Sequence, residues 1–468
     1  MVLGDWGLRL LLNSLPEPPP RWVSFAIDGR GWLFAGLMVA GAALLGALPV
    51  IRSAWKLDLH GILQSSTQQS TMTGGRRRSL HALVVAEMAL TLVVMAQAGL
   101  LVLTFRRLQR VDPGYRPDQV LVYDITLLET RYKSGEERRA FFQEHLERVR
   151  GLAGVVSASA ITAPPLHGHW GNFFVAENAP PKGPNEPDPV VLQRIAFPGY
   201  FETMGIPVLA GRSFTDQDGI NDGSRAVIVN ETFARRSWPD QNPVGKRIRI
   251  NHRDAPWMTV IGVARDVKHY GLDQPVIPGV YLPFAQDSQA HMSLVVRSSV
   301  APTSLVPSIQ ALVRERDPEL PVSGVVTMEE RLRQSMWARR LAASLFGIFS
   351  GVALLMAAGG IYGVFSYAVS RRTQEIGVRR ALGAQGGEIL WLVIRQGFVL
   401  SAAGIGIGLC GALLATPITR HLLYGVSPFE PFTIAAVTLG LSLVAVLACW
   451  VPARRAMKVD PVEALRWE

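Results

Sequence analysis

Long uninterrupted apolar runs constrain this chain more than any other feature of its sequence. A helix needs about 20 mostly apolar residues to cross about 30 Å of hydrocarbon at about 1.5 Å per residue. Five segments meet that requirement: Trp32–Ile51, Leu80–Phe105, Leu341–Val369, Ile389–Thr419 and Pro431–Ala453. The sequence therefore predicts an α-helical membrane protein with about five transmembrane helices in a lipid bilayer.

The distribution of charge orients these spans. Charged residues make up 18% of the 468 residues, against about 25% in soluble domains. The stretch 52–79 holds five basic side chains against the single acid Asp58, and the tail after Ala453 begins with RRAMK. Because basic loops stay cytoplasmic, we expect the linker 52–79 and the tail inside, with residues 1–31 and 106–338 outside. The net charge of +10 then reflects topology, and nucleic acid is not an expected partner.

The external segment reads as one mixed α/β domain. An alternating strand at 118–127, a helix at 135–152 and a strand at 155–162 stand near its start. The same order returns at 291–298, 302–318 and 321–328, and between the two units lie further strands at 225–230, 246–250 and 257–267. This arrangement predicts a domain with two lobes and leaves the pairing of the strands open.

No motif in the chain indicates catalysis. His167 and His169 form a His-x-His pair without a third ligand at a fitting spacing. The stretch 216–223 resembles a calcium loop, but Ile220 stands where an oxygen ligand belongs. We therefore expect no enzyme activity, metal site or cofactor, and no nucleotide-binding motif is present.

A compact basic stretch, RRTQEIGVRRALGA (371–384), separates the third and fourth apolar runs. As a helix it pairs Arg371 with Glu375 and Glu375 with Arg379 at i,i+4 spacing, and it offers a small apolar contact surface. Such a stretch either anchors the topology, as cytoplasmic basic loops do, or docks a partner.

Another motif is repeated within the chain. RSAWKLDLHGIL (52–63) follows the first span and RRAMKVDPVEAL (454–465) follows the last, with five of twelve positions identical. The repeat predicts a duplicated unit whose first copy keeps only its last span, at 32–51.

These motifs resemble the FtsX-like permease superfamily, the transmembrane subunits of MacB-type ABC transporters. Three stretches of the external domain carry the same resemblance: PGYFETMGIPVLAGRSF (198–214), VIVNETFARRSWPDQNPVGKRIRI (227–250) and TVIGVARDVKHYGL (259–272). The resemblance implies a MacB-like periplasmic core domain at 106–338 and an FtsX-like permease domain at 339–468. The repeated motif at 52–63 resembles the arrangement in the duplicated members of the family, in which two copies of the unit are fused.

In that family the basic stretch is a cytoplasmic loop that docks on an ABC ATPase subunit. The resemblance implies this role for Arg371, Arg372, Glu375, Ile376, Gly377, Arg379, Arg380, Ala381, Leu382 and Gly383. It implies a C-terminal cytoplasmic motif of Pro452, Arg454, Arg455, Lys458, Asp460 and Pro461. It also implies a separate ATPase subunit, a second permease copy, a periplasmic adaptor or effector, and a multi-pass location in the bacterial inner membrane.

Polar residues inside the spans are the remaining candidates. Glu87 is an intramembrane carboxylate, which either serves substrate or proton transfer or takes part in helix packing. Thr91 and Gln97 favour a polar seam against another helix, and the small-residue run GIGIGLCGALLA (404–415) favours close helix packing.

The function that follows is mechanical. A permease of this family couples ATP hydrolysis on another subunit to movement of its periplasmic domain, for export or efflux. Two alternatives stay open: a transmembrane signal transmitter that regulates a periplasmic partner, and an inactive orphan half-permease.

Overall fold

The structure is a computed structural model that describes residues 29–55, 74–168, 170–178, 189–219, 225–250, 255–371, 386–420, 423–427 and 429–456. The chain divides into two compact units. One is helical and combines Met1–Gln109 with Ala338–Glu468; the other, Arg110–Trp337, is built on a β-sheet.

The helical unit contains α2 (Gly29–Trp55), α4 (Gly74–Leu108), α10 (Trp337–Arg371), α12 (Gly386–Thr419) and α13 (Pro431–Ala456). Within the described residues, four segments are long and apolar enough to cross a membrane. They are Leu80–Leu108, Trp337–Ser370, Ile394–Thr419 and Pro431–Arg455. Four predicted spans are thus confirmed by length and composition. The first, at 32–51, lies in the helix α2 but is not among these four, so the count of five stays a prediction.

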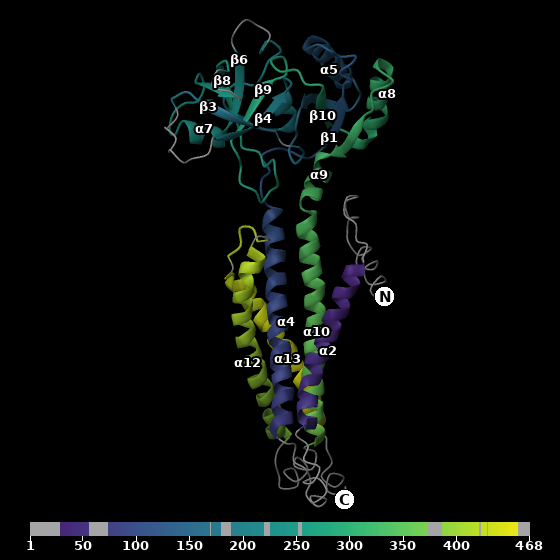
Figure 1. Cartoon of the computed structure of the whole chain (residues 1–468), viewed down its shortest axis with the longest axis vertical. Coiled ribbons are helices and arrows are strands. Elements are labelled where there is room, and N and C mark those ends of the chain that lie inside the picture. The colour runs from purple at the N-terminus through teal and green to yellow at the C-terminus, as the bar shows by residue number, and fades with distance from the viewer. Residues whose placement is uncertain are drawn as a thin grey trace, which may run out of the picture. The chain divides into compact units, whose positions relative to one another are not determined.

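Helix α4 lies at the centre of this unit, between α12 and α10 (Figure 1). More than half of its apolar window, 56%, is buried, against 11% for α10. Met88 and Leu92 of α4 pack with Ile361 and Phe365 of α10 and Leu441 of α13 in one apolar cluster. The bundle is therefore organised around α4, with α10 the most exposed of the four apolar helices.

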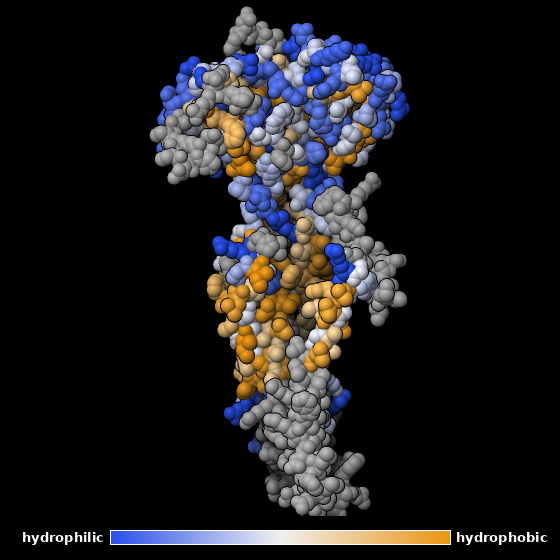
Figure 2. All heavy atoms as spheres, viewed as in Figure 1, coloured by the Kyte–Doolittle hydropathy of each residue, from blue (hydrophilic) through white to orange (hydrophobic). Residues whose placement is uncertain are grey.

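Apolar side chains also cover the outside of the helical unit along the middle of its length (Figure 2). Leu355 is 75% exposed, Leu414 79% and Phe432 83%. A surface of this kind is too apolar and too extensive for water and suits contact with lipid chains.

The second unit carries eleven strands, with helices on their faces. In chain order its elements are β1 (Val120–Thr126), α5 (Gly135–Arg150), β2 (Val155–Ile161), β3 (Gly171–Ala176), β4 (Val190–Ala196), α6 (Tyr200–Met204), β5 (Val208–Gly211), β6 (Arg225–Asn230), α7 (Glu231–Ser237), β7 (Arg247–Ile250), β8 (Met258–Ala264), β9 (Gly279–Pro283), β10 (His291–Ser298), η1 (Pro302–Leu305), α8 (Val306–Arg316), β11 (Ser323–Thr327) and α9 (Met328–Ser335). The helices and strands predicted in this unit are confirmed, including the repeated strand–helix–strand order.

The pairing of the strands divides the sheet into two sections. One is antiparallel in the order β11-β1-β10-β2, with α5 packed on β2 and against α8, a split β-α-β arrangement. In the other, β4, β3, β7, β8, β6 and β9 pair in a closed ring, because β9 also pairs with β4. A single register pair, Ile161 with Ala196, joins the two sections.

One hydrophobic core runs through both sections. Helix α5 begins in a capping box, in which Ser134 and Glu137 satisfy each other's backbone N–H groups. Its buried face includes Phe142, whose ring lies 5.7 Å from that of Phe284, the residue after β9. Because this core crosses from one section into the other, a division into two lobes stays a prediction.

Candidate functional site

The predicted ATPase-coupling loop lies almost wholly outside the described residues. Arg371 is the last residue of α10, and the loop's other nine predicted residues, between 372 and 383, are not described. Their role therefore stays a prediction from the sequence.

The predicted C-terminal motif begins inside α13. Pro452, Arg454 and Arg455 lie in its last turns, whereas Lys458, Asp460 and Pro461 lie outside the described residues. Arg455 donates a hydrogen bond of 3.0 Å from Nη1 to the Tyr362 hydroxyl of α10. The guanidinium of Arg454 stacks over the Trp450 ring at 5.5 Å from its centroid. Basic residues at this helix end are favoured by the helix dipole, and one of them ties α13 to α10.

A polar seam joins α4 to α10. The Glu87 carboxylate lies against Gly360, where a Cβ atom would overlap Oε2. The Thr91 hydroxyl donates to the Ala353 carbonyl at 3.3 Å, and Ser350 of α10 donates to the Val94 carbonyl at 3.3 Å. The sequence predicted polar contacts for Thr91, and the seam supports a packing role for Glu87, whose function stays a prediction.

Glycines bring α12 close to α4. A Cβ at Gly404 would lie 2.7 Å from the Met88 Cβ, and one at Gly408 would lie 2.9 Å from both the Ala89 carbonyl oxygen and the Leu92 Cβ. The predicted close packing of the run 404–415 is therefore confirmed. Only residues without a Cβ allow the two backbones this approach.

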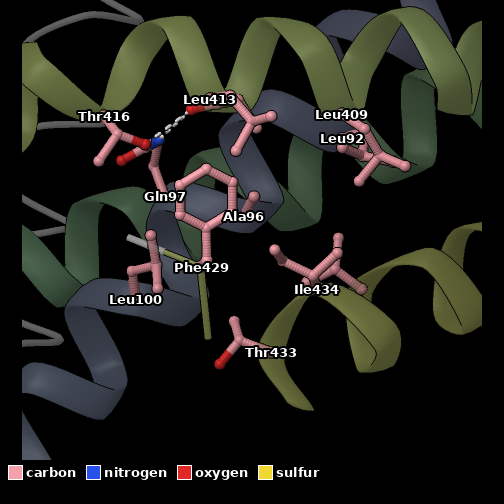
Figure 3. A pocket seen from close by; sticks show the side chains of 12 residues that line it. Leu92, Ala96, Gln97, Leu100, Leu409, Leu413, Thr416, Phe429, Thr433 and Ile434 are labelled. Atoms are coloured by element: carbon pink, nitrogen blue, oxygen red, sulfur yellow. Dashed lines mark hydrogen bonds between the residues drawn. The ribbon is translucent and has the colours of Figure 1, made fainter. Parts of the chain in front are cut away.

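Beyond these glycines the helices separate around a cavity of about 200 Å³ (Figure 3). Its walls come from α4, α12 and α13 and from the connection between α12 and α13. The lining residues are Leu92, Ala96, Gln97, Leu100, Leu409, Ala412, Leu413, Thr416, Phe429, Thr433, Ile434 and Val437. Helix α13 approaches α4 closely beside it, since a Cβ at Gly99 would lie 2.5 Å from the Thr433 methyl group.

Two polar side chains of this cavity, Gln97 and Thr416, form hydrogen bonds within the bundle. Gln97, 3% exposed, accepts a hydrogen bond of 2.7 Å at Oε1 from the Thr419 hydroxyl. Its Nε2 donates to the Ala412 carbonyl at 3.4 Å, to which the Thr416 hydroxyl also donates at 2.9 Å (Figure 3). The predicted contact of Gln97 with another helix is confirmed, and the rest of the wall is left almost wholly apolar.

The Phe429 ring lines the cavity from the connection between α12 and α13. It is nonetheless 62% exposed, and Figure 3 shows it amid the lining side chains. Arg107, at the end of α4, holds the connection that carries it: its guanidinium bonds the Gly425 carbonyl and forms an ion pair of 2.8 Å with Glu430. Sequence analysis missed this anchor, because no local pattern links Arg107 to an acid 323 residues away.

In the sheet unit, the structure describes only part of each of the two weak metal motifs. His167 is exposed, and His169 and residues 220–223 lie outside the described residues. Arg212 forms hydrogen bonds of 2.7 Å with both carboxylate oxygens of Asp218 and thereby lowers the pKa of that carboxyl. No group of three or more potential metal ligands occurs in the part of the chain that is described.

Buried polar groups under β4 and β9 are structural in character. Arg194, 2% exposed, donates from Nε to the Ala163 carbonyl at 3.2 Å, and burial lowers its pKa. The Tyr281 hydroxyl contacts Nε2 of His269 at 3.3 Å, and burial lowers the pKa of that imidazole well below its usual range. These contacts join β4 to the segment that carries Ala163 and β9 to the segment that carries His269.

Two domain families match the chain. Residues 83–316, half of its length, match the MacB-like periplasmic core domain, and residues 347–461 match the FtsX-like permease C-terminal domain. The chain is 28% identical over 281 residues to the uncharacterized ABC transporter permease YknZ of Bacillus subtilis (strain 168), covering 58% of this chain and 68% of that protein. It is 27% identical over 276 residues to the macrolide export ATP-binding/permease protein MacB of Marinobacter nauticus, covering 56% of this chain but only 41% of that relative.

Among solved structures, the periplasmic region of MacB from Actinobacillus actinomycetemcomitans matches with 14% identity and a TM-score of 0.32, over 48% of this chain and 95% of that one. The domain families cover both the sheet unit and the apolar helices that follow it. This chain therefore belongs to the family of MacB-type, FtsX-like ABC transporter permeases.

Proposed function

We propose that this chain is the non-enzymatic permease subunit of an ABC export system. It couples ATP hydrolysis on a separate ATPase subunit to movement of its extracytoplasmic domain in the bacterial inner membrane. In this proposal the domain spans about 106–338, the basic stretch 371–384 docks the ATPase, and a second permease copy and a periplasmic adaptor complete the assembly. The name of the MacB relative, a macrolide export protein, favours an export role over signal transmission.

The observation that carries the proposal is the connection between the two units. Helix α4 ends at Leu108, two residues before the sheet unit begins at Arg110, and α10 begins at Trp337, the last residue of that unit. A displacement of α4 is therefore passed to the chain at the start of the sheet unit, and a displacement of α10 is passed to the chain at its end. Polar contacts at Glu87, Thr91 and Ser350 interrupt the apolar packing of α4 on α10, and an interrupted interface permits relative movement at a lower cost than a continuous apolar one.

The test is co-purification. The full chain is extracted from its own membranes in mild detergent, and co-eluting proteins are identified by mass spectrometry. We expect an ATP-binding subunit with the natural chain and its loss from an Arg379→Ala/Arg380→Ala variant. The matched control is Arg106→Ala/Arg110→Ala, which removes two exposed charges elsewhere and should retain the subunit.

The outcomes separate the alternatives. An ATPase lost only from the loop variant supports the coupling role. Co-purification of a peptidoglycan hydrolase or sensor protein together with the ATPase would support the signal-transmitter alternative instead. Absence of any ATPase from the natural chain refutes the permease proposal and favours an orphan half-permease.

A further inference from the structure

The cavity between α4, α12 and α13 is separate from every motif that the transport proposal uses. All of its lining residues except Phe429 lie in the apolar segments Leu80–Leu108, Ile394–Thr419 and Pro431–Arg455, and Phe429 belongs to the connection between the last two. In a bilayer these segments are surrounded mostly by hydrocarbon rather than water.

We propose that this cavity binds one alkyl chain of a lipid or other amphiphile, with the Phe429 ring as part of its wall. The chemistry of the walls selects the class of ligand. The one buried amide, Gln97, turns its oxygen to Thr419 and its nitrogen to the backbone of Ala412, so the surface offered to a guest is carbon. A polar guest would lose its own hydrogen bonds there without replacement.

The size of the cavity limits the guest to part of a chain. A dry apolar cavity of about 150 Å³ accepts one benzene molecule. The present volume, about 200 Å³, therefore suits a short alkyl segment, whose remainder lies among the surrounding lipids. An empty cavity would leave its lining atoms without packing partners on one side.

The packing around the cavity makes it a built feature. The glycine contacts of Gly404 and Gly408 bring α4 and α12 together on one side, and the Gly99–Thr433 contact brings α4 and α13 together on another. The anchor from Arg107 to Gly425 and Glu430 holds the connection that carries Phe429. A guest is therefore held between walls whose positions are set by these contacts.

The experiment uses the full chain in lipid nanodiscs without any ATPase, so its outcome is independent of the proposed transport function. Two probes carry a photoreactive diazirine at the end of an alkyl chain: a phosphatidylethanolamine and a free fatty acid. After illumination, mass spectrometry locates the adducts as the fraction of probe is raised. The α10 segment around Leu355, which is 75% exposed, reports contact with bulk lipid.

We expect adducts at Leu92–Leu100 and Leu409–Thr416 to saturate at a low fraction of probe and to be competed by unlabelled chains. Those near Leu355 should rise in proportion to the probe. Saturation with the phospholipid identifies a bilayer lipid as the guest, and saturation with the fatty acid alone identifies a free amphiphile. A linear rise at the cavity with both probes, or no adduct there, overturns the proposal.

A variant pair gives a second criterion. Ala96→Phe places a ring in the cavity and should lower the saturable adducts several-fold. Ala402→Phe, in the separate groove between α12 and α13, should leave them unchanged. Equal yields of saturable adducts in the two variants would contradict the proposed binding site. If Ala96→Phe fails to fold, the saturation measured on the natural chain decides the proposal.

Discussion

The glycine contacts between α4 and α12 give the sharpest test of the helical unit. In Gly408→Ala the new methyl group would lie 2.9 Å from the Ala89 carbonyl oxygen and 3.1 Å from the Ala89 Cα. Neither is the end of a flexible side chain, so the helices must move apart. In Gly406→Ala, two residues earlier in the same helix, the methyl group meets nothing within 4 Å.

The expected magnitude follows from the difference between these variants. Both replace a helical glycine by alanine and gain about 0.5–1 kcal/mol from helix propensity, so this gain cancels in the comparison. What remains is the overpacking at Gly408, about 1–3 kcal/mol. A midpoint of thermal unfolding shifts by about 2–4 °C per kcal/mol for a unit of this size, which predicts a gap on the order of 2–12 °C.

The assay is thermal unfolding of the two purified variants and the natural chain in one detergent, followed by loss of the monodisperse peak in gel filtration. We expect Gly406→Ala to match or exceed the natural chain and Gly408→Ala to melt below it. Equal midpoints for the two variants would mean that α4 and α12 are not in contact at Gly408, and the bundle described above would be wrong.

Three further predictions address other contacts. Gly360→Ala should weaken the seam by displacing the Glu87 carboxylate, and adding Glu87→Ala should restore stability. A double-mutant cycle of unfolding free energies measures this coupling, and additive losses would exclude the contact. Burial lowers the pKa of His145 to about 4, whereas it is about 6.5 in the unfolded chain. Because the unfolded chain then binds the proton first, the free energy of unfolding is highest above pH 6.5 and falls by about 3 kcal/mol as the pH drops toward 4. Pulse proteolysis in urea at pH 7 and pH 4.5 should show a smaller loss for His145→Gln, and an unchanged loss would contradict the assignment. Arg107→Ala should raise protease cleavage in the connection after Gly425. It should lower the free energy of unfolding by less than about 1 kcal/mol, because the ion pair is partly exposed. Unchanged cleavage would show that Arg107 does not hold this connection.

The position of these contacts also bears on the transport proposal. Glu87, Thr91 and Gln97 follow one another along α4, but they serve different neighbours. Glu87 and Thr91 face α10, whereas Gln97 faces α12. Helix α4 is thus held firmly on the side of α12 by glycine contacts and more sparsely on the side of α10. A movement that couples the two ends of the bundle would therefore use the α10 side.

Much of the architecture could be predicted from the sequence because its signals are local. The length of an apolar run determines whether a helix can cross a bilayer, and four of the predicted spans are present. Alternation and i,i+4 spacing likewise predicted β1, α5 and β10, since these patterns depend on residues within one turn or one strand. Polar residues within a span also predicted that Thr91 and Gln97 would contact other helices.

What they contact was decided only by the tertiary structure. Gln97 meets Thr419 across 322 residues, and Glu87 meets Gly360 on another helix. The pairing of β4 with β9, which closes the ring, likewise joins two strands whose own sequences give no sign of this pairing. The cavity is the clearest case, because it is a space between three helices whose separation depends on glycines in α4 and α12 and on the side chains that face them. Periodicity along a chain specifies each element's face, whereas register and distance between faces arise only when all the elements pack together.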